Sequence, residues 1–310
     1  MRKMLSPRTI AAMALLAIAT SAAACNIPVF RYALERWRSD AYELVIAHAE
    51  PLSPQQSAIV RRFQAADGKT NLTVALKQDA EATIPQASLR MAMPTGRTVS
   101  HWQGSIEQAA AVSLLDSPVR KELVKRLLAG DSVVWLLLRS NNQVRSDASR
   151  DLLDESFEKL SASIRLPEGV GQPGSELHSE VPLLVKFSAI EIDPADKQEQ
   201  FLIKWLAGFR PQSLKQGEPL LVPVFGRGRA LEVIPAGELS PELIEDLTLF
   251  LSGACSCQVK EQNPGFDLLL TVDWDTQLFG EHGLRPPAAQ PAADRKLTPR
   301  TLAIPPGKRK

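Results

Sequence analysis

The feature of this sequence with the most reactive chemistry is a pair of cysteines separated by one residue, Cys255 and Cys257. A disulfide between them would close a tight ring, and strained disulfides are oxidising and labile. Two thiolates are also ligands that Cu(I) or Zn prefers, although zinc usually takes four ligands. The third interpretation is structural, with both thiols packed among apolar side chains or paired with another chain. The four histidines form no spaced cluster that would complete a metal site.

A second candidate site is a set of basic residues near a glycine turn. Arg227 and Arg229 flank Gly228 in the sequence, and Lys260 follows the cysteine pair. Guanidinium and ammonium groups are the usual protein ligands of anions. These three residues are therefore candidates for an anion contact, the alternative being that they are solvated turn residues.

The third cysteine, Cys25, stands at the end of a stretch that is typical of an export signal. Three bases, Arg2, Lys3 and Arg8, precede an uncharged apolar run over residues 10–24. This run is shorter than the ~20 residues that cross a bilayer. No later apolar segment approaches that length.

Small residues directly before a cysteine are typical of a lipoprotein processing site. Ala23 and Ala24 precede Cys25, although Ala22 stands where the pattern prefers Leu. We therefore expect residues 1–24 to be a signal peptide and Cys25 to carry the lipid, which would hold the protein to the periplasmic side of a bacterial membrane. The alternative is ordinary cleavage, which would give a soluble periplasmic or secreted protein.

Composition indicates a folded protein and argues against several classes of function. Of the 310 residues, 44% are hydrophobic and 23% are charged, unlike a disordered or collagen-like chain. The 36 basic and 35 acidic residues nearly balance, whereas a dedicated nucleic-acid binder carries a strong basic excess. Nucleic acid is therefore not an expected partner. The chain also lacks a Gly-x-Ser-x-Gly, a phosphate loop, a His-Glu-x-x-His and a dinucleotide fingerprint, so catalysis is not the expected activity.

Hydrophobic patterns and turn residues divide the chain into segments. Residues 25–40 form an aromatic-rich segment that we expect to dock on the first domain, which covers 41–116. A second domain covers 117–284, and 285–310 is a Pro-rich basic tail that we expect to be disordered. The first domain should contain strands at 42–49, 71–77, 89–93 and 98–102, with helices at 54–66 and 106–115. The second should contain a helix at 119–129, strands at 132–138, 182–192, 220–225, 231–234 and 268–272, and helices at 148–164, 197–209 and 241–251.

This order of elements resembles the thioredoxin fold. The second half reads strand, helix, strand, helix, two strands and helix, and the first half reads as the same order without one helix. The expected fold class is therefore α/β, with two thioredoxin-like domains in tandem, the first degenerate. Each would be a small mixed sheet with flanking helices.

The resemblance does not extend to the thioredoxin active site. Thioredoxin-type enzymes place a Cys-x-x-Cys where the first strand meets its helix, because the helix N-terminus lowers the thiol pKa. Here residues 50–53 and 139–142 stand at the two equivalent positions, and neither contains cysteine. We therefore expect both active-site positions to be vacant.

Longer stretches resemble a group of uncharacterised bacterial exported proteins. These are Cys25 to Trp37 (CNIPVFRYALERW), Leu114 to Leu137, Val224 to Arg229 and Ser252 to Leu269, the last of which contains CSCQVKEQNPG. The resemblance implies a lipoprotein-like start and a shared fold, and it brings no reaction. The sequence thus predicts a lipid-anchored envelope protein that acts as a non-catalytic binding or accessory module, with another envelope protein as its partner. The alternative is a thiol-disulfide redox or soft-metal protein using Cys255 and Cys257. Apart from Cu or Zn at that pair, no cofactor is expected.

Overall fold

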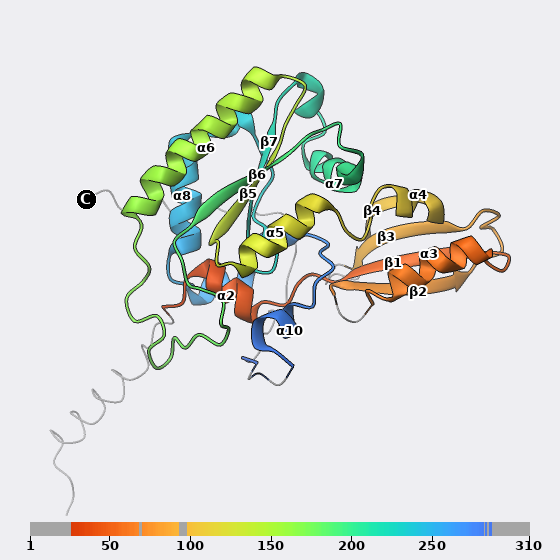
Figure 1. Ribbon diagram of the computed structural model, residues 1–310, viewed down its shortest axis with the longest axis horizontal. Coiled ribbons are helices and arrows are strands. Elements are labelled where there is room, and N and C mark those ends of the chain that lie inside the picture. The colour runs from red at the N-terminus through yellow and green to blue at the C-terminus, as the bar shows by residue number, and fades with distance from the viewer. Residues whose placement is uncertain (1–25, 68–69, 93–97, 282, 284, 287–310) are drawn as a thin grey trace, which may run out of the picture.

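The computed structural model describes residues 26–67, 70–92, 98–281, 283, 285 and 286. Two mixed α/β units follow each other along the chain, one with a four-stranded sheet and one with a larger sheet (Figure 1). The predicted fold class is therefore confirmed. The predicted signal peptide, Cys25 and nearly all of the basic tail lie outside the described residues.

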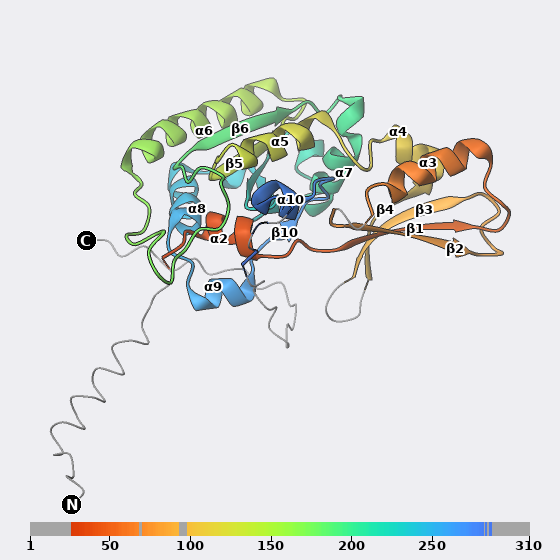
Figure 2. The same ribbon diagram turned by 60° about the horizontal axis from the view of Figure 1, so that its bottom comes forward.

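The first unit is a four-stranded sheet whose helices α3 and α4 cover the same face (Figure 2). The strand order is β2-β1-β3-β4, in which β1 and β2 are parallel and the other neighbours are antiparallel. This is the strand order of the thioredoxin fold without the helix that joins its second and third strands. The elements are β1 (Tyr42–His48), α3 (Pro54–Gln64), β2 (Leu72–Gln78), β3 (Gln86–Ala92), β4 (Thr98–Ser105) and α4 (Ile106–Ala111).

The second unit has the complete thioredoxin order. Its strands follow the sequence β10-β8-β7-β5-β6, with β5 parallel to β6 and antiparallel to β7. Its core elements are α5 (Pro118–Leu128), β5 (Val133–Leu138), α6 (Gln143–Ser163), β6 (Phe187–Ile192), α7 (Gln200–Phe209), β7 (Leu220–Phe225), β8 (Arg229–Ala230), β9 (Ile234–Pro235) and α8 (Pro241–Ser252). Three short elements complete the chain: α9 (Cys257–Gln262), β10 (Phe266–Asp267) and α10 (Trp274–Phe279).

Serine-proline pairs begin three of the helices as the sequence predicts. Ser53, Ser117 and Ser240 each accept a hydrogen bond from the backbone N–H three residues later, and a proline follows each of them. The serine oxygen satisfies a donor that the helix leaves unpaired, and the fixed φ of proline suits the first helical position.

The central strand β5 is covered on both faces, as its uninterrupted apolar sequence predicts. Val134, Leu136 and Leu138 belong to the hydrophobic cluster that contains α5 and α7. Their neighbours Val133, Trp135 and Leu137 belong to the cluster that contains α2, α6 and α8. Alternate side chains of a strand point to opposite faces, so this one strand joins both cores of the second unit.

The segment that follows Cys25 docks on the second unit, so the prediction that it packs on the first domain is wrong. It forms α2 (Val29–Arg36), which lies against α8 and β7 (Figure 1). Val29, Phe30 and Ala33 are buried in the cluster of α6 and α8. A backbone hydrogen bond from Val29 to Gly253 fixes the start of the helix. The prediction assigns the segment to the domain that follows it directly in the sequence. Its apolar face instead packs on the second unit, which is more distant in the sequence.

Several predicted boundaries also need correction. Helix α6 begins at Gln143 rather than Ala148, because Asn142 caps a first turn whose single apolar residue, Val144, does not create an apolar period. Strand β6 begins five residues later than predicted, and of the strand predicted at 231–234 only Ile234 lies in a strand, as the first residue of β9, while β8 ends at Ala230. The strand predicted at 268–272 does not form: Asn71 bonds the carbonyl of Leu268 and the N–H of Leu270, replacing a strand partner.

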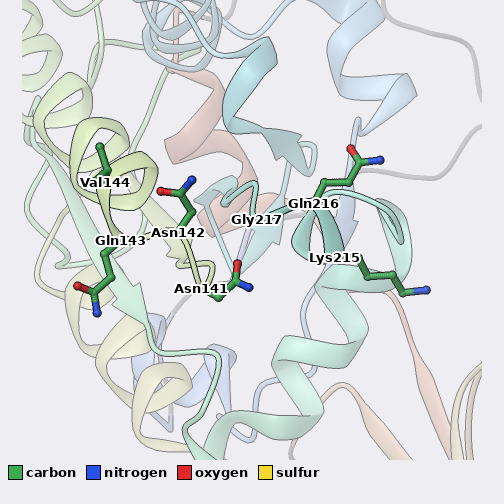
Figure 3. Close-up of a pocket in the computed structure, with 7 residues that line it drawn as sticks. All are labelled: Asn141, Asn142, Gln143, Val144, Lys215, Gln216 and Gly217. Atoms are coloured by element: carbon green, nitrogen blue, oxygen red, sulfur yellow. The ribbon is translucent and has the colours of Figure 1, made fainter.

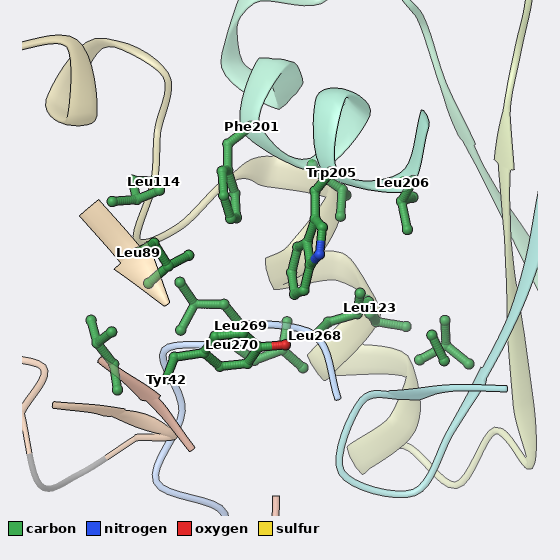
Figure 4. Packing of buried hydrophobic residues seen from close by; sticks show 14 of the residues in the cluster. Tyr42, Leu89, Leu114, Leu123, Phe201, Trp205, Leu206, Leu268, Leu269 and Leu270 are labelled. Carbon is green, nitrogen blue, oxygen red and sulfur yellow. The ribbon is translucent and has the colours of Figure 1, made fainter. Parts of the chain in front are cut away.

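Residues Leu268 to Leu270 connect the two units. All three are buried, and in Figure 4 they lie between Tyr42 of the first unit and Trp205 of α7. The Tyr42 hydroxyl donates to the Asp267 carbonyl at 2.6 Å, and the rings of Tyr42 and Trp205 meet edge to face at 5.6 Å. The first unit therefore shares a continuous hydrophobic core with the second.

Candidate functional site

The two cysteines of the pair occupy different environments. Cys255 is buried against α2, and its N–H donates to the Ile27 carbonyl at 2.9 Å. Cys257 is exposed as the first residue of α9, which Ser256 caps. The structure does not join the two by a disulfide. Among the described residues, no group of three or more His, Cys, Asp or Glu is placed to hold a metal ion. Redox or metal chemistry at this pair stays a prediction.

Arg229 belongs to a buried ionic network, which corrects the anion contact predicted there. Its guanidinium is 2.5 Å from the Asp267 carboxylate and 3.4 Å from that of Asp40. The remaining donors bond the backbone carbonyls of the turn after α9, namely those of Asn263, Pro264 and Gly265. With 3% of its side chain exposed, Arg229 is closed to an anion from solvent.

The other two predicted contacts lie apart from Arg229. Arg227 donates to the Leu34 carbonyl at 2.7 Å and pairs with Asp275 of α10 at 2.9 Å. Lys260 lies over the ring of Tyr32, 5.1 Å from its centroid. The structure therefore does not bring the three predicted residues together around one site.

The Asp267 network predicts an unusual dependence of stability on pH. Burial raises the pKa of Asp267 to about 6, an effect that Arg229 opposes and Asp40 reinforces. The folded pKa thus exceeds the ordinary value of 3.8. Between these two values the folded chain holds a proton that the unfolded chain has lost, so this contribution to stability is complete below about pH 4 and disappears as the pH rises through 6.

We expect this contribution to show in a comparison with Asp267→Asn, which cannot titrate. The unfolding free energy of the wild type minus that of the variant should be larger at pH 4.5 than at pH 7.5, by about 2 kcal/mol. Urea denaturation at both pH values measures it. A difference that stays constant, or grows toward pH 7.5, would contradict the shifted pKa.

The position that holds the dithiol in a thioredoxin fold is an open polar hollow in the second unit. The hollow has a volume of about 660 Å³. In Figure 3 its residues come from two segments, one formed by the loop after β5 together with the first turn of α6, and the other lying before β7. They are Asn141, Asn142, Gln143, Val144, Lys215, Gln216 and Gly217. No cysteine lies among them.

Hydrogen bonds hold the two loops of the hollow in place. The buried Ser140 hydroxyl donates to the Gly217 carbonyl at 2.8 Å, joining one loop to the other. The Ser140 N–H donates to the Ser146 hydroxyl at 3.1 Å, and Asn142 accepts from the Arg145 N–H at 3.1 Å to cap α6. Gly217 has φ of +71°, and a β-carbon there would lie 3.1 Å from the Asn141 side-chain oxygen. The hollow is therefore a fixed feature whose close loop approach favours glycine.

The rim of the hollow combines an apolar and several polar groups. Val144 is 79% exposed, the highest value among the large hydrophobic residues described. The hollow is also lined by the amides of Asn141 and Gln143, which both donate and accept hydrogen bonds, and by the cationic Lys215. The N-terminus of α6 adds partial positive charge. These groups can contact a ligand through hydrogen bonds, through charge and through an apolar side chain.

The equivalent position of the first unit is the N-terminus of α3. Ser53 and Gln56 close it with a reciprocal capping box, and the Gln56 amide also donates to Glu107 of α4. This position likewise contains no thiol.

Sequence reasoning noted that thiols were absent from 139–142 but missed the hollow. The polar first turn of α6 hid the helix start, and Lys215 to Gly217 lie far from Asn141 in the sequence. The signal that was available is Asn142, because asparagine is among the preferred residues for capping a helix. With that start assigned, Gln143 and Val144 fall in the first turn beside the vacant position.

No described helix is both long and apolar enough to cross a membrane. Comparison of the chain with protein-family models and with curated proteins finds no match.

Proposed function

We propose that this chain is an exported, lipid-anchored protein of the bacterial cell envelope that acts as a non-catalytic binding module for another envelope protein. The observation that carries the proposal is the hollow at the N-terminus of α6. Enzymes with this fold place a dithiol at this position. In this chain the same position carries side-chain amides, an exposed valine and a lysine instead. Such groups bind a ligand and do not react with it.

The groups around the hollow suit an extended segment of a partner protein. Side-chain amides match the donors and acceptors of a peptide backbone, and Val144 offers an apolar contact. Lys215 and the helix N-terminus favour a carboxylate. We therefore expect a partner segment that carries an apolar side chain next to an acidic one.

The N-terminal sequence supports export and anchoring. Residues 1–24 have the basic and apolar parts of a signal peptide, and small residues precede Cys25. The chain is tied to the second unit directly afterwards: Asn26 donates to the Ser175 hydroxyl, and Ile27 accepts from Cys255. A lipid on Cys25 would therefore hold the second unit close to the membrane surface.

Site-specific crosslinking in intact bacteria tests the binding. A photoreactive amino acid replacing Val144 should give a discrete covalent adduct with one envelope protein. The matched control replaces Leu249 of α8, which is also exposed, and should give no adduct. Lys215→Glu should remove most of the adduct at position 144, because it reverses the charge beside the hollow.

Protein from the same cells also tests whether Cys25 carries a lipid. The intact mass of the protein from the membrane fraction should equal that of the chain from Cys25 onward plus a diacylglyceryl-containing modification.

A crosslinked adduct that forms equally from position 249, or that survives Lys215→Glu, would contradict binding at the hollow. A chain that begins at Cys25 without modification would contradict the anchor alone.

A further inference from the structure

A second, smaller hollow lies at the other end of the second unit. Its volume is about 230 Å³, and it is formed by the end of α2, the β7–β8 turn, α10 and residues 285–286. Four arginines line it: Arg36, Arg38, Arg227 and Arg285. Buried aromatic rings, among them Trp37, form part of the wall. The hollow therefore concentrates positive charge beside buried aromatic rings.

The two acidic residues of this hollow are already engaged. Glu35 accepts from Arg31 at 2.8 Å, and it also accepts from the N–H groups of His178 and Ser179. Asp275 contacts Arg227 with one oxygen at 2.9 Å and Arg285 with the other at 3.3 Å. Each carboxylate is thus shared among several donors, and the hollow keeps an excess of positive charge.

One of the arginines retains a donor that no acceptor among the described residues fills. Arg36 donates one nitrogen to the Glu176 carbonyl, but its buried Nε has no hydrogen-bond partner within the described residues. Arg38 is exposed to solvent. A buried donor without an acceptor is costly, so an incoming anion at Arg36 would relieve that cost.

We propose that this arginine hollow binds a phosphate group. Guanidinium groups pair with phosphate oxygens through two parallel hydrogen bonds, and several arginines around one small hollow match an anion with several acceptor oxygens. Arg227 is held in position by the Leu34 carbonyl, so part of the site exists before a ligand arrives. The phosphate belongs either to a soluble ligand or to the headgroup of an anionic phospholipid.

Calorimetric titration of the purified protein with inorganic phosphate tests the site. Arg38→Gln combined with Arg285→Gln should weaken binding about tenfold, since each removes a charge-assisted hydrogen bond. The control Arg61→Gln with Arg62→Gln removes the same charge from an exposed face of α3 in the first unit. It should leave the affinity unchanged. Melting curves of both variants check that the fold is intact.

A third variant changes the affinity in the opposite direction. Asp275→Asn removes the carboxylate that competes for Arg227 and Arg285, so phosphate should bind about threefold more tightly. A purely structural role for Asp275 would not improve binding. An affinity that is the same in the wild type and in the Arg38/Arg285 variant, or that falls equally in the Arg61/Arg62 control, would overturn the proposal.

Vesicles separate the two sources of phosphate. If the ligand is a lipid headgroup, the protein should bind phosphatidylglycerol vesicles but not phosphatidylcholine vesicles, and the Arg38/Arg285 variant should bind them about tenfold more weakly. Binding of inorganic phosphate without arginine-dependent vesicle binding would assign a soluble phosphate ligand. This test is independent of the hollow at α6, so its failure leaves the proposed function standing.

Discussion

Arg120→Met is expected to lower the unfolding free energy by at least about 3 kcal/mol. Arg120 lies in α5 with 2% of its surface exposed. Its guanidinium donates to the carbonyls of Leu114 and Leu115, which precede α5, and to that of Leu269, which lies between the two units. It also bonds the Ser113 carbonyl and the Ser117 hydroxyl. Methionine fills a similar volume but removes the donor from the four carbonyls, those of Ser113, Leu114, Leu115 and Leu269.

The size of the effect follows from what remains buried after the change. Each orphaned buried acceptor costs ~1–3 kcal/mol, so even partial relaxation leaves a large loss. Burial lowers the pKa of Arg120 to about 10, an effect that the charges of Asp116 and Glu199 oppose. The group therefore stays charged at neutral pH. The gain of apolar surface in methionine offsets only part of the loss.

Urea denaturation of three variants isolates this role. Lys125→Met removes the same charge from a side chain of α5 that is 79% exposed, and should change stability by less than about 0.5 kcal/mol. Arg120→Lys should be nearly as damaging as Arg120→Met, because a single ammonium cannot reach acceptors spread around a planar guanidinium. If Arg120→Met unfolds at the same urea concentration as the wild type, the hydrogen bonds of Arg120 do not hold the two units together.

Much of the fold could be predicted because it depends on local signals. The Ser-Pro caps, the uninterrupted apolar run of β5 and the glycine turn near Arg227 each determine an element within a few residues. The order of these elements then determines both sheets. What could not be predicted depends on contacts between distant residues, such as the docking of α2 on α8 and the role of Asn71 as a partner for residues 268–270.

The candidate sites likewise combine features that local sequence predicts with features that depend on contacts between distant residues. The absence of thiols after β5 can be read directly from the sequence, whereas the hollow needs Lys215 and Gly217 beside Asn141. Arg227 and Arg229 are two residues apart in the chain, but Arg227 lies in the turn between β7 and β8 whereas Arg229 is the first residue of β8, so the two side chains meet different partners. Their spacing therefore gave no indication that one is buried and the other lines a hollow.

Asn142→Cys combined with Arg145→Cys should give this protein a thiol-disulfide exchange activity that the wild type lacks. Asn142 caps α6, and the N–H of Arg145 donates to its side chain, so the two positions lie side by side at the helix N-terminus. They have the Cys-x-x-Cys spacing of a thioredoxin site. The helix N-terminus lowers the pKa of thiols placed there, which supplies the reactive thiolate.

The central claim is that the second unit is a thioredoxin fold in which a binding hollow replaces the dithiol. The most direct test measures reduction of insulin disulfides by dithiothreitol in the presence of each protein. The account predicts acceleration by the Asn142/Arg145 variant and none above the uncatalysed rate by the wild type or by Cys255→Ser with Cys257→Ser. A wild-type protein that accelerates the reaction, and loses that activity when Cys255 and Cys257 become serine, would contradict it.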